Sequence, residues 1–282
     1  MTLKTTQELM RDSYEYANAA FASLVRFDDA AAVVTGGAQG IGRGIAGRLA
    51  ELGAAVTLVD VDPAVDAAAA ALAEQHGTAV TARTLDVRRS ADLAEVAREV
   101  LTAGVRRLIW VNAAGIYPSH LLPDLSDEDW DRVVGIDLTA TFYGSRAAGL
   151  AVRDAGLEGV IVNISSVAGF RVGRPPGLAH YASAKHGVQG LTKALAVELG
   201  PYGVRAVAVA PGAVVTEGLV AKFGDLDLEG GTDYFSTRAQ EMPIRRPSLP
   251  DDVARAVCFL ASHAASNITG VVLPVDAGQL VL

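Results

Sequence analysis

Short apolar runs alternate with longer amphipathic stretches along most of the chain. The runs are rich in Val, Ile and Ala, and most stay apolar from end to end instead of alternating with polar residues. Such runs are typical of parallel strands that are covered by helices on both faces. The predicted strands are 31–35, 55–60, 79–86, 108–112, 159–165, 204–210 and 270–276.

Helical spacing of apolar residues marks the stretches between these runs. The clearest predicted helices are 41–52, 63–75, 91–103, 128–154 and 181–199. Strands that alternate with helices through right-handed crossovers give a doubly wound α/β fold. We therefore expect one domain with a mostly parallel, seven-stranded, Rossmann-type sheet. Neither a linker nor a break in composition divides it.

Residues 1–28 stand apart from this pattern. Thr5 and Glu8 form a candidate capping box, and apolar residues from Leu9 to Leu24 recur at helical spacing. This predicts an N-terminal helical extension, followed by a cofactor-binding and catalytic domain over 29–282. The extension could pack on its own subunit or contact another one, and the sequence favours neither.

Composition narrows the function. The chain has 282 residues and a net charge of −8, with a pI near 5.1 and no basic tract, so nucleic acid is not an expected partner. Cys258 is the only cysteine and lies in an apolar helical pattern, which predicts a buried residue and no disulfide. No apolar run is long enough to span a membrane, and the charged N-terminus is unlike a signal peptide. We expect a cytoplasmic protein with no membrane partner.

A glycine-rich turn follows the first predicted strand. The segment T-G-G-A-Q-G-I-G, residues 35–42, leads directly into a helix. Gly36, Gly40 and Gly42 allow a tight turn and let the backbone approach a pyrophosphate at the helix N-terminus. The spacing differs from the G-x-G-x-x-G fingerprint, and the absence of Lys argues against a phosphate-transferring P-loop.

Polar or small residues close the next three strands. Asp60 is placed to accept hydrogen bonds from the adenosine ribose and to repel a 2′-phosphate, which favours NAD over NADP. Asp86 and Val87 could bracket the adenine. The segment Asn112–Gly115, which includes Ala113, leaves room for the cofactor. All lie at the carboxyl edge of the sheet, where open α/β folds bind ligands.

Tyr181 and Lys185 are four residues apart at the start of a predicted helix. Residues with this spacing share a helix face. An ammonium about 4 Å from the phenol contributes roughly 4 kcal/mol at an effective dielectric near 20. This corresponds to about three pKa units, enough to bring a tyrosine toward neutrality. The pair is therefore a candidate for general acid–base chemistry.

Several motifs together resemble the short-chain dehydrogenase/reductase family. They are T-G-G-A-Q-G-I-G, N-A-A-G, I-V-N-I-S-S, Y-A-S-A-K, A-P-G-A-V-V-T and the C-terminal N-I-T-G-V-V-L-P-V-D-A-G. They occur in the family's order over residues 29–279, and the chain is most similar to the shorter, single-domain members. Residues 1–28 lie outside the resemblance.

The resemblance implies roles for individual residues. Tyr181 would be the general acid/base, Lys185 would lower its pKa and hold the nicotinamide ribose, and Ser166 would hydrogen-bond the substrate oxygen. Ser165 is adjacent and remains an alternative to Ser166. The full set of expected cofactor-binding residues is Gly36, Gln39, Gly40, Ile41, Gly42, Asp60, Asp86, Val87, Asn112, Ala113, Gly115, Tyr181, Lys185, Pro211, Gly212, Val214 and Thr216.

Asp137 is a departure from the family pattern. Most members carry asparagine here, which completes a proton relay through water to the lysine. Aspartate has the same shape but only accepts hydrogen bonds when ionised, and it adds negative charge near Lys185. Asp137 is therefore a candidate supporting catalytic residue that would raise the pKa of Lys185. A structural role at a helix kink is the alternative.

The substrate side is less well determined by sequence. Arg171, Arg174, Pro175 and Pro176 lie in the loop before Tyr181 and resemble members that act on polyols, although a proline-stiffened surface loop is the alternative. Residues 217–242 correspond to the family's substrate lid. Candidate lining residues are Tyr117, His120, Leu121, Phe223, Tyr234 and Phe235. His180 is expected to point to another helix face, and we predict no metal site and no catalytic triad based on it.

These features predict an NAD-dependent oxidoreductase that interconverts a secondary alcohol, such as a polyol or cyclic alcohol, and a ketone. One alternative is a 3-oxoacyl-thioester reductase of the same fold, which usually uses NADPH. Enoyl reduction is disfavoured because enoyl reductases space the tyrosine and lysine differently. A non-catalytic NAD-binding sensor is a second alternative, although sensors tend to lose one of these two residues. The resemblance also implies a homotetramer that packs through helices 128–154 and 181–200.

Overall fold

A computed structural model describes residues 18–102, 104–172, 176–218, 220, 227–228, 232–233 and 239–282. Most of the predicted N-terminal helix therefore lies outside the described residues. Its last part holds a short helix, α2 (Phe21–Leu24), and Phe27, whose side chain is fully buried in the core. The division of the chain at residue 28 remains a prediction.

Seven parallel strands form the central sheet, in the order β3-β2-β1-β4-β5-β6-β9. Their register pairs Thr35 with Val59 on one side and with Asn112 on the other, so the strands end at one edge. The predicted doubly wound sheet is confirmed, and each predicted strand is present. The strands are β1 (Ala30–Thr35), β2 (Ala55–Asp60), β3 (Val80–Thr84), β4 (Arg107–Asn112), β5 (Glu158–Ile164), β6 (Val204–Pro211) and β9 (Val272–Val275).

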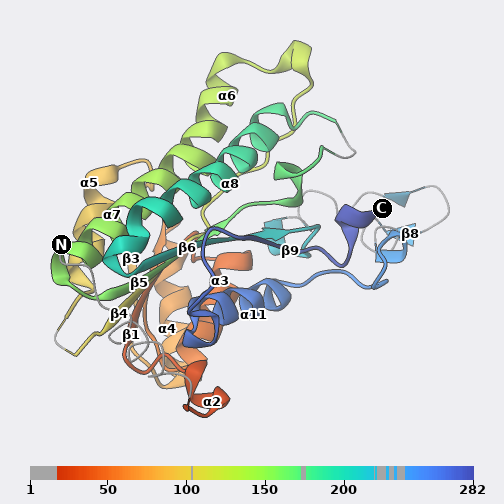
Figure 1. Ribbon diagram of the computed structural model, residues 1–282. Coiled ribbons are helices and arrows are strands. Elements are labelled where there is room, and N and C mark those ends of the chain that lie inside the picture. The colour runs from red at the N-terminus through yellow and green to blue at the C-terminus, as the bar shows by residue number, and fades with distance from the viewer. Residues whose placement is uncertain are drawn as a thin grey trace.

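Helices cover both faces of this sheet, as Figure 1 shows. On one face, α3 (Gly40–Glu51), α4 (Ala64–His76) and α11 (Pro250–Ala261) pack over alternate residues of β1, β5 and β6. Cys258 lies in this core, and burial raises the pKa of its thiol to about 12, so it is an inert packing residue.

The opposite face is covered by α5 (Ser90–Glu99), α7 (Ala140–Ala155) and α8 (Ala179–Leu199), and α6 (Asp127–Val134) packs against α8. The predicted helix 128–154 is interrupted by a π-helical turn, η2 (Gly135–Thr139), that joins α6 to α7. Such turns are rare and frequently occur at functional sites. Asp137 is at its centre.

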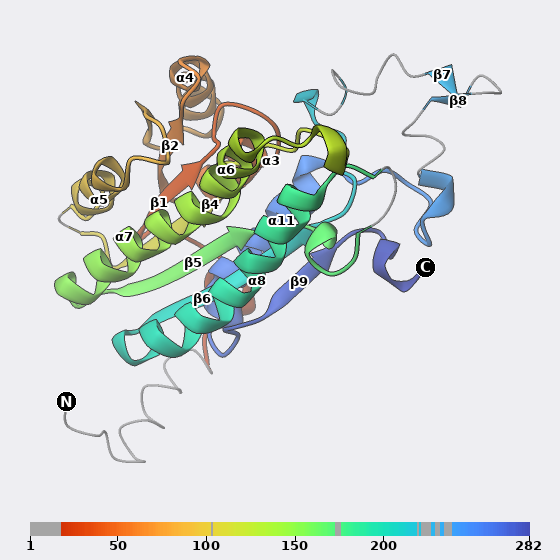
Figure 2. The ribbon, with the colours of Figure 1, turned by 90° about the horizontal axis from the view of Figure 1, so that it is seen from above.

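Short elements complete the fold. A two-stranded antiparallel hairpin, β7 (Asp227–Leu228) with β8 (Thr232–Asp233), lies within the predicted lid and away from the main sheet (Figure 2). Within the described ranges, no helix has both the length and the apolar character needed to cross a membrane. The short 3₁₀ helices are η1 (Leu122–Asp124), η3 (Val167–Gly169), η4 (Gly200–Tyr202), η5 (His263–Ala265) and η6 (Gln279–Val281).

Candidate active site

The glycine turn lies where β1 passes into α3. Gly36 and Gly40 have positive φ angles of 69° and 58°, which glycine adopts without strain. A Cβ at Gly42 would stand 2.1 Å from the carbonyl oxygen of Gly36, so no side chain fits there. Gln39, the N-cap of α3, makes no side-chain capping bond within the described chain, and Ile41 lies in the first helical turn. The backbone amides of this helix end remain available to an anion.

Two side chains, Thr35 and Asp60, connect the glycine turn to neighbouring strand ends by hydrogen bonds. Thr35 Oγ1 accepts hydrogen bonds from the backbone N–H groups of Ala113 and Ala114, at 3.0 and 3.2 Å. Asp60 Oδ2 accepts from the N–H of Ala38 at 3.0 Å. Asp60 thus lies beside the glycine turn, as a ribose-binding carboxylate would. The role of Thr35 was missed, although its place at the strand end before the first glycine was visible.

Asp86 is engaged by a neighbour that sequence reasoning left out. Both of its oxygens accept from the Arg88 guanidinium, with Nε at 3.0 and 2.9 Å, and Oδ1 also accepts from the Arg88 N–H. The hydrogen bonds from Arg88 lower the pKa of Asp86. This carboxylate is therefore shared with Arg88, which leaves it less capacity to bind an adenine amino group. Val87 beside it is buried.

The Asn112 side chain belongs to a buried polar network. Its Oδ1 accepts from Trp110 Nε1 at 2.9 Å, and its Nδ2 donates to Ser145 Oγ and Asn163 Oδ1 at 3.0 and 2.8 Å. Asn163 in turn donates to Thr192 Oγ1 in α8. The side chain thus joins β4 to α7, β5 and α8. Because the side-chain amide of Asn112 is occupied by these hydrogen bonds, only the backbone of this residue is left to contact a cofactor.

The adjacent serines differ in what their hydroxyls contact. Ser165 Oγ is 3.0 Å from the carbonyl oxygen of Lys185, to which it donates, so it is used to pack α8 against β5. Ser166 Oγ accepts from the N–H of Ala168 at 3.1 Å and also makes a hydrogen bond with Tyr181. The geometry favours Ser166 as the partner of the tyrosine.

Lys185 is almost completely buried and has two anionic or polar partners. Its Nζ lies 3.0 Å from Asp137 Oδ1 and 3.1 Å from the carbonyl oxygen of Ile164, to which it donates. Asp137 is fully buried, and its Oδ2 accepts from the N–H of Ile116. A Cβ at Gly115 would come within 2.5 Å of Asp137 Oδ1, so this glycine makes room for the ion pair.

Burial and the ion pair set the charges of this corner. Burial lowers the pKa of Lys185, but Asp137 and Tyr181 together outweigh it, and the pKa is raised. The pKa of Asp137 is raised by burial, against the effect of Lys185. The pKa of Tyr181 is raised as well, first by burial; Lys185 opposes this and Asp137 adds to it. Lys185 lowers the pKa of Tyr181 as predicted, but burial outweighs it and Asp137 adds to the rise, so the predicted net shift toward neutrality is wrong for the chain by itself.

The segment after β6 runs along the same edge. Gly212 donates its N–H to Val275 at 3.1 Å, and Val214 is buried in a bridge with Ser248. Thr216 lies beside the glycine turn, because a Cβ at Gly40 would stand 3.5 Å from its Cγ2. The segment starts at Pro211, the last residue of β6, and reaches the glycine turn at Thr216; its role in orienting the nicotinamide remains a prediction.

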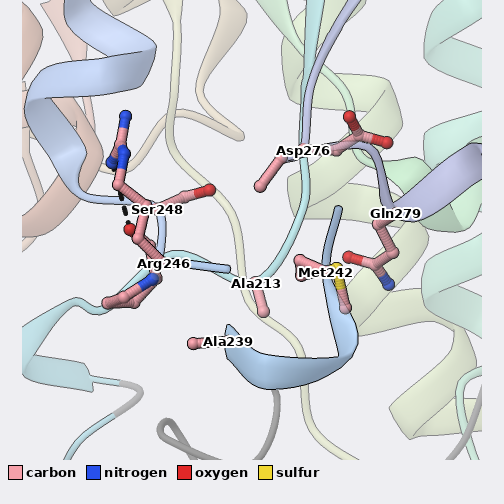
Figure 3. A pocket seen from close by; sticks show the side chains of 9 residues that line it. Ala213, Ala239, Met242, Arg246, Ser248, Asp276 and Gln279 are labelled. Carbon is pink, nitrogen blue, oxygen red and sulfur yellow. Dashed lines mark hydrogen bonds between the residues drawn. The ribbon is translucent and has the colours of Figure 1, made fainter. Parts of the chain in front are cut away.

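A small cavity lies behind this segment, as Figure 3 shows. Arg246 and Ser248 line one side and Met242 and Gln279 the other, with Ala213 between them. The cavity contains neither Ser166 nor Tyr181 nor Lys185. It separates the C-terminal residues from the 211–216 segment and is not where the predicted catalytic groups meet.

The predicted substrate-lining residues have different surroundings. The Tyr117 ring meets the Tyr181 ring edge-on, with centroids 6.5 Å apart, whereas the Leu121 side chain is exposed. His120 lies next to His180, which is fully buried. Arg171 donates from Nη1 to the carbonyl oxygen of Leu282 at 2.5 Å. Five of the predicted residues, Arg174, Pro175, Phe223, Tyr234 and Phe235, lie outside the described residues.

The chemistry of this edge fits a nicotinamide dinucleotide. The glycine turn forms a cradle that a Cβ would fill, α3 presents its amino end to it, and Asp60 lies alongside. Lys185 contacts the end of β5, and its partner Asp137 contacts the loop after β4, next to the β1–β4 switch point where such folds bind ligands. Among the described residues, no group of three or more His, Cys, Asp or Glu is placed to hold a metal ion.

Comparison with known proteins identifies the family. A family model described as enoyl-(acyl carrier protein) reductase matches residues 36–279. Galactitol 2-dehydrogenase from Rhizobium johnstonii is 37% identical over 90% of this chain and 96% of its own length. A 3-oxoacyl-[acyl-carrier-protein] reductase from Chlamydia trachomatis is 35% identical, with 88% and 96% covered. The family model thus indicates the family, whereas the named activities differ within it.

Solved structures agree with this assignment. Levodione reductase superposes with a TM-score of 0.80 at 34% identity, covering 91% of this chain and 99% of the other. A structure from Beutenbergia cavernae that holds NADP at low occupancy has a TM-score of 0.79 at 37% identity, with 92% and 99% covered. The chain therefore belongs to the short-chain dehydrogenase/reductase family and is an alcohol dehydrogenase or carbonyl reductase that uses a nicotinamide cofactor.

Proposed function

We propose that this protein is an NAD-dependent dehydrogenase of polyols or cyclic secondary alcohols, with Tyr181 as its general acid/base. One observation carries the mechanism: the Tyr181 hydroxyl has Ser166 as a hydrogen-bond partner, while Lys185 lies behind its ring, with Nζ 5.6 Å from the ring centroid. Together these groups can bind the oxygen of an alcohol and exchange a proton with it.

In the proposed reaction, Ser166 donates a hydrogen bond to the substrate oxygen and orients it toward Tyr181. Tyr181 removes the hydroxyl proton during oxidation and returns it during reduction. Lys185 stabilises the phenolate that forms, and it would donate a hydrogen bond to the ribose of a bound nicotinamide cofactor. A bound nicotinamide cofactor supplies the ring carbon that accepts or donates the hydride. Bulk solvent does not reach Lys185 or Asp137 directly, because both side chains are buried.

The preference for NAD rests on Asp60. Its carboxylate beside the glycine turn would repel a 2′-phosphate, and Val61, the next residue, supplies no positive charge. The polyol or cyclic-alcohol class is suggested by similarity to galactitol 2-dehydrogenase and levodione reductase. A cytoplasmic location, a homotetramer and a lid over 217–242 remain predictions from the sequence.

Reduction of 3-oxoacyl thioesters is the second candidate, favoured by similarity to the chlamydial 3-oxoacyl-[acyl-carrier-protein] reductase. Asp60 argues against it, because that activity usually depends on NADPH. A non-catalytic NAD sensor is disfavoured because Ser166, Tyr181 and Lys185 are all retained.

The test is NAD(P)H absorbance during turnover. Galactitol and cyclohexanol are supplied with NAD or NADP, and levodione and acetoacetyl-CoA with NADH or NADPH. We expect NAD-linked oxidation of an alcohol, and a loss of about 10³-fold in kcat for Tyr181→Phe. Tyr202→Phe, at an exposed tyrosine in η4, is the matched control. Faster NADPH-linked reduction of acetoacetyl-CoA would favour the second candidate, and NAD binding without turnover would favour the sensor.

A further inference from the structure

Two histidines beside the catalytic corner carry buried ring nitrogens without hydrogen-bond partners. Among the residues that the structure describes, Nε2 of His180 and Nδ1 of His120 make no hydrogen bond, although Nδ1 of His120 lies 3.4 Å from an oxygen of Asp129. The two rings are neighbours, with centroids 6.1 Å apart and planes tilted by 46°. An unpaired buried polar group costs about 1–3 kcal/mol, so Nε2 of His180, in a fully buried side chain, calls for an explanation.

The backbone determines which nitrogen of His180 carries the proton. Its Nδ1 accepts a hydrogen bond from the N–H of Tyr181 at 2.8 Å and therefore bears no hydrogen. Burial, reinforced by His120, lowers the pKa of His180 and keeps the ring neutral. The hydrogen must then be on Nε2, which makes His180 a fixed donor inside the protein. Because Nδ1 is occupied, the ring cannot pass a proton through itself, but it can hold a water molecule.

His120 connects this position to the surface. Its side chain is about one-third exposed, and its Nδ1 lies 3.4 Å from Asp129 Oδ2. Ser126 holds that carboxylate oxygen through a 2.7 Å hydrogen bond at the start of α6. The backbone of His120 is tied to Gly177, whose φ of 98° and close packing exclude a side chain. Both ends of the His120–Asp129 pair are therefore fixed.

On its inner side, His180 lies within electrostatic reach of Asp137. Asp137 is paired with Lys185, and Lys185 interacts with Tyr181. The titratable groups that act on His180 are His120, Asp129 and Asp137, and they come from the loop after β4, from α6 and from η2. Two groups of polar side chains therefore lie near each other: Lys185 with Asp137 on the inner side, and His180 with His120 and Asp129 toward the surface.

The proposed reaction needs a route for one proton. A secondary alcohol and NAD give a ketone, NADH and one proton. The hydride leaves the carbinol carbon with the bonding electron pair, and the hydroxyl proton goes to the oxygen of Tyr181. That proton must reach solvent before the next turnover, yet Lys185 is only 4% exposed and Asp137 fully buried.

We propose that His180 is a positioning residue that holds water between Asp137 and the His120–Asp129 pair, and that the proton leaves through this outlet. The proposal rests on the proposed function. Water suits the position, because it accepts from Nε2 of His180 while donating to Asp137 or to Nδ1 of His120. A histidine that only fills the core would have no effect on proton exchange.

The kinetic test compares His180→Phe and His120→Gln with His186→Gln, an exposed histidine on the same helix. Galactitol oxidation is measured in H₂O and D₂O, with and without added imidazole. We expect kcat to fall by about tenfold in the first two variants, with a larger solvent isotope effect and partial rescue by imidazole. The KM for galactitol and the His186→Gln variant should be unchanged. His120→Gln, at a partly exposed site, keeps the test valid if His180→Phe folds poorly.

A second measurement needs no turnover. In the cofactor-free protein labelled with ¹⁵N-histidine, NMR should show His180 as the neutral Nε2–H tautomer across pH 6–8, with a cross-peak to water. An unchanged solvent isotope effect in both variants would overturn the proposal, as would an Nδ1–H tautomer or no water contact. If galactitol and the other alcohols are not oxidised at all, the proposed function fails instead, and the NMR result still decides the water site.

Discussion

The two halves of the carboxyl edge are built differently. At the turn after β1, the backbone conformation shapes the cofactor cradle. Gly36 and Gly40 have positive φ angles, and a Cβ at Gly42 would collide with the backbone. At the corner between β5 and α8, buried side chains shape the site instead: Lys185, Asp137 and Tyr181 shift one another's pKa values. A side chain added at Gly42 is therefore expected to disturb cofactor binding, whereas a change of charge near Lys185 is expected to shift the pKa of Tyr181.

The largest effect is expected from a substitution in the glycine turn after β1. Gly42→Ala forces a methyl group against the Gly36 carbonyl, so NADH affinity should fall by roughly 100-fold or more, about 3 kcal/mol. Fluorescence titration with NADH measures it. Gly190→Ala is the control, because among the described residues nothing lies within 4 Å of the added Cβ. Equal NADH affinity in both variants would contradict the cradle.

The serine pair tests which side chain serves the reaction. Ser166→Ala should lower kcat by about 10²-fold or more, the size expected for a lost donor to the developing oxyanion. Ser165→Ala should instead cost about 1 kcal/mol of unfolding free energy, since it loses the bond to the Lys185 carbonyl, with kcat much less affected. Steady-state kinetics and urea unfolding of both variants separate these roles. The assignment fails if the kcat losses are equal.

Asp60→Asn tests whether this carboxylate selects NADH over NADPH. The amide keeps an acceptor for the Ala38 N–H but removes the charge, so the preference for NADH over NADPH should shrink by roughly tenfold. The ratio of the two dissociation constants is the measurement. Asp66→Asn, at an exposed carboxylate in α4, should leave that ratio alone. A preference unchanged in Asp60→Asn would mean that another residue selects the cofactor.

The smallest expected effect is a shift in pH dependence. Asp137 raises the pKa of Tyr181, so Asp137→Asn should lower it. Oxidation needs the phenolate, and the rising limb of kcat against pH should move to lower pH by about one unit. Asp131→Asn, at an exposed position of α6, should not move it. A limb that stays in place or moves to higher pH would show that Asp137 does not act on the tyrosine.

Much of the architecture could be predicted from the sequence. Continuous apolar runs separated by helical periodicity predicted β1 to β6 and β9, because strands buried on both faces have no polar side. The helix boundaries were mostly within a few residues. The π-turn over 135–139 was not predicted, because one extra residue in a helical turn leaves no distinct pattern in a stretch that stays helical on both sides.

The sequence named residues that lie together at the candidate site, but it did not predict how these residues interact. Tyr181, Lys185 and Asp137 lie together, yet their spacing could not show that burial and Asp137 raise the tyrosine pKa against the effect of Lys185. Asp86 and Asn112 lie at the predicted strand ends, but Arg88 shares the first and a buried network occupies the side chain of the second. Those partners come from other turns or elements, and no local pattern identifies them.

By itself, the sequence determined the doubly wound sheet, the glycine turn beside Asp60 and the pairing of tyrosine with lysine. These depend on local periodicity and fixed spacing, which a single chain displays directly. The tertiary structure alone revealed the different partners of Ser165 and Ser166, the charge balance at Lys185 and the position of His180 beside His120. Each depends on how deeply a group is buried and on partners distant in sequence, and both are known only once the chain is folded.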